Sequence, residues 1–139
     1  MLIRSGRPDE IPAVLFLWNE AEAIPGTTDT PEALTTLLAH DSEALLVAVT
    51  SAGQVVGTAL VTWDGWRGGV WRLAVHPQWR RQGLARSLVW EAERRLFLKG
   101  ARRLSVLIEG TDPRAVAFWS RQRGYHLDTG AQRYVARVA

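Results

Sequence analysis

The chain has 139 residues, a formal net charge of +3 and no cysteine. This length suits a single domain over residues 1–139, which buries roughly two thirds of the surface that its unfolded chain exposes. The lack of cysteine excludes disulfides, thiolate metal ligands and a cysteine nucleophile. No stretch resembles a signal peptide or reaches the ~18 apolar residues of a membrane span, so we expect a soluble, cytoplasmic protein with no membrane partner.

The charge is polarised along the chain. Residues 1–66 hold two basic and nine acidic side chains, whereas residues 67–139 hold fifteen basic and five acidic ones. We expect the basic half to hold a polyanion and the acidic half to meet a cation, the alternative being that both are solvated surface. The isoelectric point of about 10.2 is compatible with nucleic-acid binding. No basic helix face or aromatic-basic signature is clear, however, so we expect no nucleic-acid partner.

The N-terminal half predicts a strand, two helices and a hairpin. Residues 2–4 are strand-like, and Pro8 opens a helix whose apolar face includes Ile11, Val14 and Trp18. The segment 24–28 breaks this helix. Thr30 and Pro31 then resemble the N-cap and first residue of a second helix, which runs to about residue 40. Residues 44–49 and 54–63 are rich in β-formers and joined by a short turn, which indicates a hairpin.

The C-terminal half predicts two crossovers and two final strands. A strand at 70–75 is followed by an amphipathic helix at 84–99 and a strand at 103–108, which is parallel to the first because a helix intervenes. Asp112 and Pro113 open another helix, expected to stop at Gly124. Short strands at 125–127 and 133–138 follow. The order predicts a mixed α/β fold with helices on both faces of a sheet.

The loop between strand 70–75 and helix 84–99 contains Arg80-x-x-Gly83-x-Ala85. Small residues at 83 and 85 let a bound group approach the backbone closely. The unpaired amides and the dipole at a helix start favour an anion there. The motif differs from GxGxxG and from the P-loop, since no Gly-Lys-Ser/Thr follows. The alternative is a plain strand-to-helix turn.

A second motif runs from Asp112 to Tyr125 and reads Asp-Pro-Arg-Ala-Val-Ala-Phe-Trp-Ser-Arg-Gln-Arg-Gly-Tyr. Together the two motifs resemble the GNAT (GCN5-related) N-acetyltransferases. The resemblance implies a GNAT fold, a mixed but mostly antiparallel sheet of six to seven strands with a splayed parallel pair in its middle. It also implies acetyl transfer from acetyl-CoA to a primary amine by direct attack, with no metal. The amine would belong to a small molecule, a protein N-terminus or a lysine.

The resemblance also assigns cofactor-binding residues. Backbone groups of Leu73, Ala74 and Val75 would contact pantetheine, as a strand added to a sheet edge does. Backbone amides from Arg81 through Gln82, Gly83 and Leu84 to Ala85 would hold the pyrophosphate. Charge-assisted contacts would come from Arg80, Arg81 or Arg86, the alternative being that these arginines are solvated surface. Asp112 and Trp119 complete the expected cofactor-binding set.

The catalytic groups differ from the usual family pattern. Trp119 stands where many relatives place the tyrosine that protonates the departing thiolate, and an indole lacks usable acidity, so no general acid is assigned. Glu109 is the candidate base, because it would share a strand face with Leu107, where some relatives carry a glutamate. The alternative is a strand-end carboxylate in solvent. His76 and His126 are expected to be structural.

The acceptor is expected to be a cation received by Glu20 and Glu22 near the end of the first helix. Trp63, Trp66 and Trp71 flank one hairpin turn and shape an acceptor pocket or else pack in the core. The sequence does not name the acceptor, and it leaves a monomer and a homodimer open. Because Trp119 replaces the acid, the alternative function is a non-catalytic CoA-binding or regulatory module of the same fold.

Overall fold

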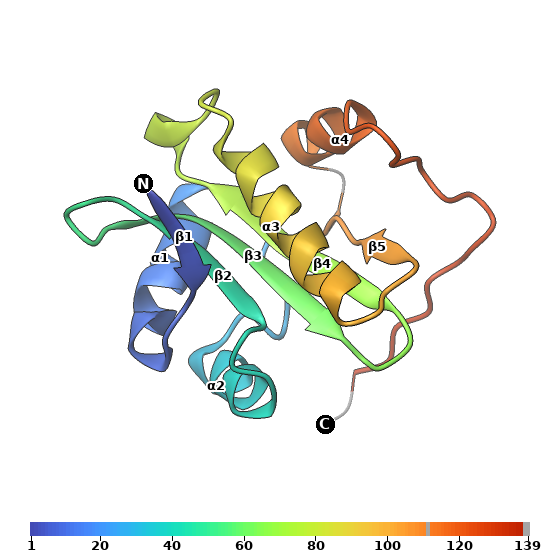
Figure 1. Cartoon of the computed structure of the whole chain (residues 1–139), viewed down its shortest axis with the longest axis horizontal. Coiled ribbons are helices and arrows are strands. Elements are labelled where there is room, and N and C mark those ends of the chain that lie inside the picture. Colours follow the sequence, from blue (N-terminus) through green and yellow to red (C-terminus); the bar gives the residue numbers. More distant parts are fainter. Residues whose placement is uncertain (111, 138–139) are drawn as a thin grey trace.

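Five apolar segments of the sequence form one sheet in the computed structural model, which describes residues 1–110 and 112–137. The strands are β1 (Leu2–Ser5), β2 (Leu45–Val49), β3 (Val55–Trp63), β4 (Gly68–Val75) and β5 (Leu104–Val106). They lie in the order β1-β2-β3-β4-β5 (Figure 1). The first four pair antiparallel, and β5 pairs parallel with β4. The sheet is thus mixed and mostly antiparallel, as predicted.

The helices lie where the sequence predicts them. They are α1 (Ile11–Glu20), α2 (Pro31–His40), α3 (Leu84–Leu98) and α4 (Pro113–Ser120), with short 3-10 turns at η1 (Pro8–Glu10) and η2 (Pro77–Trp79). Thr30 Oγ1 accepts a hydrogen bond of 3.1 Å from the Ala33 amide at the start of α2. Asp112 Oδ1 accepts one of 3.0 Å from the Arg114 amide at the start of α4. Both predicted caps are confirmed.

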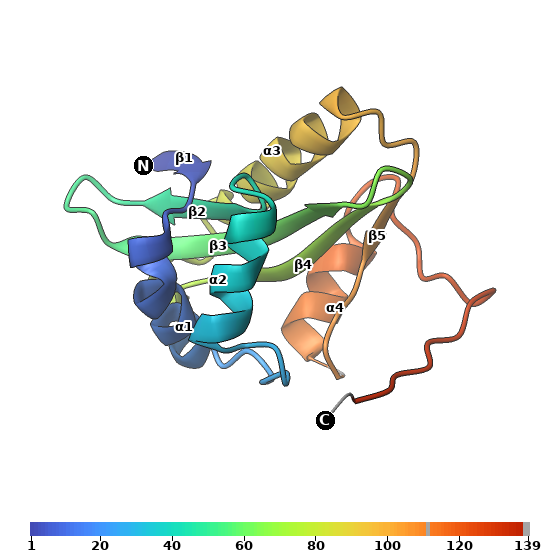
Figure 2. The ribbon, with the colours of Figure 1, turned by 90° about the horizontal axis from the view of Figure 1, so that it is seen from below.

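Helices cover both faces of the sheet, and each face has its own apolar core. Val14, Leu17 and Trp18 of α1 pack with α2 against one face. On the other face, Leu88 and Leu96 belong to the α3 side of a core cluster that also contains Val70 of β4 and Trp119 of α4. Figure 2 shows α1 and α2 on one side of the strands and α3 on the other. The predicted layering is confirmed.

The parallel pair is short. Gly68, Gly69 and Val70 of β4 pair with Leu104, Ser105 and Val106 of β5, and the register ends there. Gly68 permits this close approach, because a Cβ at that position would lie 2.8 Å from Leu104 Cδ2 and 3.0 Å from Leu96 Cδ1. Beyond Val70 the two strands separate, as the splayed pair of the prediction requires.

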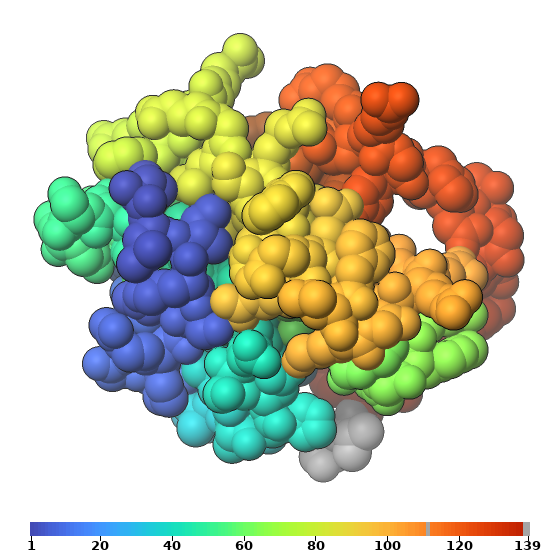
Figure 3. All heavy atoms as spheres, viewed as in Figure 1, coloured from blue at the N-terminus to red at the C-terminus, as the bar shows by residue number. Residues whose placement is uncertain are grey.

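The prediction of two further strands was wrong for the described residues. Residues 125–127 and 133–137 form no strand, and residue 138 lies outside the described part of the chain. Within residues 1–110 and 112–137 the sheet therefore has five strands rather than six or seven, and the parallel pair lies at its edge rather than in its middle. Leu127 and Tyr134 are 87% and 89% exposed, so this segment buries no apolar face, which strand pairing needs. Figure 3 shows open space between the residues after α4 and the β5 region. Helix α4 also ends before the predicted Gly124.

Candidate active site

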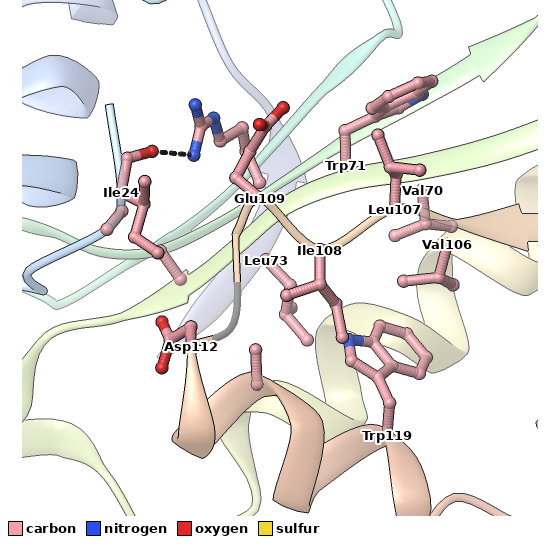
Figure 4. A pocket seen from close by; sticks show the side chains of 14 residues that line it. Ile24, Val70, Trp71, Leu73, Val106, Leu107, Ile108, Glu109, Asp112 and Trp119 are labelled. Carbon is pink, nitrogen blue, oxygen red and sulfur yellow. Dashed lines mark hydrogen bonds between the residues drawn. The ribbon is translucent and has the colours of Figure 1, made fainter. Parts of the chain in front are cut away.

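A cleft opens where β4 and β5 separate. One wall consists of residues 70–74 of β4, and the other consists of residues 106–109, which include the end of β5 and the segment after it (Figure 4). Residues 23–24 line one end of the cleft, and Asp112, Ala115 and Trp119 of the α4 region complete the lining. After Val70 no β5 residue pairs with β4 in the described ladder. The β4 edge facing the cleft therefore presents backbone groups that the sheet does not use.

The cleft has two chemically different sides. Side chains after Val106 alternate, so Leu107 and Glu109 point to the side of α1 and Ile108 points to the side of α3 and α4 (Figure 4). Trp71 lies on the Glu109 side, and Trp119 lies on the opposite side. Glu109 therefore shares a face with Leu107, as the sequence predicted, and it is half-buried in the cleft wall.

Arg72 fixes one wall of the cleft, a role that sequence reasoning missed. Its backbone is left-handed, with φ of 50°, and its guanidinium forms a two-pronged ion pair with Asp29. Arg72 Nη1 also donates to the Ile24 carbonyl at 2.8 Å. Thr58 Oγ1 donates to the Arg72 carbonyl at 3.1 Å and accepts from Trp18 Nε1 at 2.8 Å. A charged residue inside an otherwise apolar strand was the signal that could have revealed this network.

The loop before α3 leaves helix amides free. Arg81 and Gly83 are both left-handed, with φ of 61° and 78°, and Gly83 is the N-cap without a capping side chain. Among the described residues, no hydrogen bond reaches the amides of Leu84, Ala85 or Arg86; the first intrahelical bond runs from the Ser87 amide to the Gly83 carbonyl at 3.1 Å. Free amides at a helix start form a concave donor site for an anion.

The basic residues of this loop differ in their surroundings. Arg81, Gln82 and Arg86 are exposed beside the helix start. Arg80 instead donates from Nε to the Val75 carbonyl and from Nη2 to the Ala21 carbonyl, both at 3.2 Å. It thereby ties the end of α1 to the end of β4. Burial lowers the pKa of the Arg80 guanidinium, and the positive charge of Arg114 adds to this effect.

Trp119 belongs to an aromatic cluster. It is 9% exposed, and its ring centroid lies 5.1 Å from that of Phe118 and 5.0 Å from that of Tyr125. Tyr125 Oη donates to Glu93 at 2.8 Å. Burial, together with the Glu93 carboxylate, raises the pKa of Tyr125 above its usual range. Tyr125 is therefore a poor proton donor at neutral pH, and it does not line the cleft.

The two acidic residues predicted to bind the acceptor lie outside the cleft lining. Glu20 is the exposed last residue of α1. Glu22 accepts a hydrogen bond of 2.9 Å from Arg114 Nη2 of α4, in an exposed ion pair. His76 caps η2, where its Nδ1 accepts from the Gln78 amide at 3.2 Å, whereas His126 is exposed.

The described residues contain neither a cluster suited to a metal ion nor a helix suited to crossing a membrane. Residues 1–110 and 112–137 contain no group of three or more His, Asp or Glu side chains placed to hold a metal ion. No helix in the same residues combines the length and the apolar character that crossing a membrane requires.

Comparison with known proteins identifies the family. Residues 11–125 match the acetyltransferase (GNAT) family. An acetyltransferase of Sodalis glossinidius is 30% identical over 121 residues, which cover 87% of this chain and 84% of that protein. A solved acetyltransferase from Agrobacterium tumefaciens, itself described as putative, superposes with a TM-score of 0.70 at 22% identity over 97% of this chain and 100% of its own.

A further solved structure is similar in fold and contains a bound ligand. The PaiA N-acetyltransferase of Thermoplasma acidophilum in complex with coenzyme A has a TM-score of 0.71 at 14% identity, over 86% of each chain. At these identities the two structures establish the fold alone. The family match, which spans most of the chain, and the Sodalis relative go further: this chain belongs to the GNAT family and is an N-acetyltransferase.

Proposed function

We propose that the donor is acetyl-CoA, that the acceptor is a primary amine, and that the acetyl group passes directly between them in the β4–β5 cleft. The observation that carries the proposal is that the unpaired edge of β4 and the free amides at the start of α3 follow one another along the chain. The cleft-facing edge of β4 is unpaired beyond Val70, and this strand leads through the loop to the free amides at the start of α3. An extended amide chain ending in a diphosphate matches these two features in that order.

The residues around α3 fit the diphosphate. The amides from Arg81 to Ala85 would donate to its oxygens, with the exposed Arg81, Gln82 and Arg86 beside them. A Cβ built on Gly83 meets no atom within 4 Å, so the space above this residue is open to a ligand. Arg80 would act by holding Val75 and the end of α1 in place. Leu73, Ala74 and Val75 would bind pantetheine through their backbone groups. Asp112 and Trp119 would line the other side.

The reaction needs a neutral amine. Glu109 takes a proton from the incoming ammonium, and the amine nitrogen attacks the thioester carbonyl. A tetrahedral oxyanion forms and is stabilised by a backbone N–H near Val75. The nitrogen of this intermediate passes its second proton to a water molecule, and the C–S bond breaks. The leaving thiolate takes this proton back through water, because the Trp119 indole cannot supply one, and Glu109 releases its own proton to solvent. Trp119 orients the sulfur by packing.

This function is tested by measuring the release of free CoA thiol from acetyl-CoA in the presence of a panel of amines. Mass spectrometry then identifies the acetylated amine. Glu109→Gln should lower kcat by about 10²–10⁴-fold while leaving the Kd for acetyl-CoA unchanged. Tight acetyl-CoA binding without thiol release from any amine would overturn the proposal. That outcome would favour the non-catalytic CoA-binding module instead.

A further inference from the structure

A β-bulge in β4 determines which side chains of this strand point to the acceptor side of the cleft. Thr58 pairs with Ala74 and Leu60 with Trp71, so β4 has one residue more than β3 between these two pairs. The extra residue is accommodated by the left-handed backbone of Arg72. A bulge turns neighbouring side chains away from the regular alternation. Trp71 consequently faces the same side of the cleft as Glu109 (Figure 4), and the Arg72 guanidinium lies on the α1 side, 5.5 Å from the ring centroid of Trp18.

Trp71 is held as a fixed, open platform. Its Nε1 donates to Thr62 Oγ1 at 2.9 Å, which defines the position of the ring. The residue nevertheless remains 36% exposed and lines the cleft. Ile24, which is 39% exposed, lies in the same lining and is anchored through its carbonyl by Arg72. Leu107 adds a third apolar side chain (Figure 4).

The charges on this side are nearly balanced. Arg72 is neutralised by Asp29. Asp112 caps α4 through the Arg114 amide. Of the two carboxylates in the cleft lining, Asp112 and Glu109, Glu109 has no ion-pair or hydrogen-bond partner among residues 1–110 and 112–137. One carboxylate matches one ammonium group, whereas a polyamine or an aminoglycoside would leave further cations facing apolar surface.

From this arrangement we infer that the acceptor is a monoamine carried on an apolar body. The body rests against Trp71 and Leu107, and the amino group lies at Glu109, between these side chains and Ile24 (Figure 4). A Trp face also attracts an approaching ammonium group. The inference rests on the proposed function and specifies its substrate class. A free arylalkylamine and a peptide with an apolar N-terminal residue share this chemistry, and the experiment separates them.

The test compares amines that differ only in the body. Phenethylamine should have a kcat/KM at least tenfold above that of ethylamine and above that of spermidine. If the natural acceptor is a peptide, a peptide with an N-terminal Phe should have a kcat/KM at least tenfold above that of a peptide with an N-terminal Gly. If the natural acceptor is a small molecule, the kcat/KM of phenethylamine should exceed that of both peptides. Equal values for phenethylamine and ethylamine, or a preference for spermidine, would overturn the inference.

Two tryptophan variants, Trp71→Ala and Trp66→Ala as its control, test whether the preference for phenethylamine depends on Trp71. Trp71→Ala should abolish the preference for phenethylamine over ethylamine. Trp66→Ala should preserve it, because Trp66 is 71% exposed in the β3–β4 turn and does not line the cleft. Thr62→Val, which removes the partner of the indole N–H, should reduce the preference by a smaller factor. A fall in kcat/KM that is equal for every amine in Trp71→Ala would show that the residue acts on the fold and not on specificity.

Calorimetry separates a failure of this inference from a failure of the proposed function. Phenethylamine is titrated into the protein saturated with CoA, so that binding is measured without turnover. Binding that is present in the parent protein and lost in Trp71→Ala supports the acceptor class even if no acetyl group is transferred. Turnover of other amines without phenethylamine binding refutes the acceptor class and leaves the proposed function intact.

Discussion

Replacing Gly83 by valine should separate cofactor binding from stability. Gly83 is left-handed, with φ of 78°, and a Cβ built there meets no atom within 4 Å. The loss in stability therefore comes from the backbone alone, about 1–2 kcal/mol for a side chain held in this conformation. With an unfolding entropy of about 2.1 cal/mol/K per residue, or roughly 0.3 kcal/mol/K for the whole chain, Tm should fall by about 3–7 °C.

Gly53 provides a matched control. It has φ of 83°, equally open surroundings, and a place in the β2–β3 turn, away from α3. Gly53→Val should lower Tm by a similar amount and leave acetyl-CoA binding unchanged. Gly83→Val should weaken binding at least tenfold, or about 1.4 kcal/mol, because its side chain occupies the space before the α3 amides. Calorimetry with acetyl-CoA measures the difference, and equal affinities in two folded variants would refute the diphosphate site.

Three further predictions concern other parts of the molecule. Trp119→Tyr should keep or raise turnover, because it preserves an aromatic ring beside Phe118 and adds an ionisable donor; a collapse of kcat with intact CoA binding would show that the indole has another role. Glu20 and Glu22 lie outside the cleft lining, so they would act on a cationic acceptor by electrostatic steering: neutralising both should raise the acceptor KM more than the acetyl-CoA KM, and kcat/KM of the parent should fall as salt rises; an effect on acetyl-CoA alone would contradict an acidic acceptor side. Hydrogen bonding to Arg4 lowers the pKa of Glu10, so this pair stabilises the protein above about pH 4.5 and the benefit is lost as pH falls through the lowered pKa; the Tm difference between the parent and Glu10→Gln should therefore be largest near neutral pH and shrink in acid.

The sequence predicted the elements that have strong local signals. Thr30 and Asp112 cap their helices as expected, and apolar periodicity located α3. The parallel pairing of β4 and β5 followed from the helix between them. These features depend on neighbours a few residues apart, or on a general rule of chain connection, so a single sequence is sufficient to predict them.

Contacts between residues far apart in the chain could not be predicted from the sequence. The ion pair of Arg72 with Asp29 joins residues 43 positions apart, and the bulge depends on a register shift against β3. Residues 125–127 and 133–137 were wrongly predicted to form strands, because their β-propensity is real but they find no partner edge among the described residues. The roles of Glu109, Glu20 and Glu22 stay predictions, which the variants above test.

The unpaired edge of β4 has a consequence for how this protein changes over evolution. Recognition along that edge and at the start of α3 would use main-chain atoms, which almost any substitution preserves. On the opposite side, Trp71, Leu107 and Glu109 would contact the acceptor through side chains, and each can be exchanged without altering the main-chain edge. Mutations would therefore seldom change which donor is used, whereas they would readily change which acceptor is used. A small library varied at these three positions should therefore yield enzymes with new amine preferences that retain the same donor.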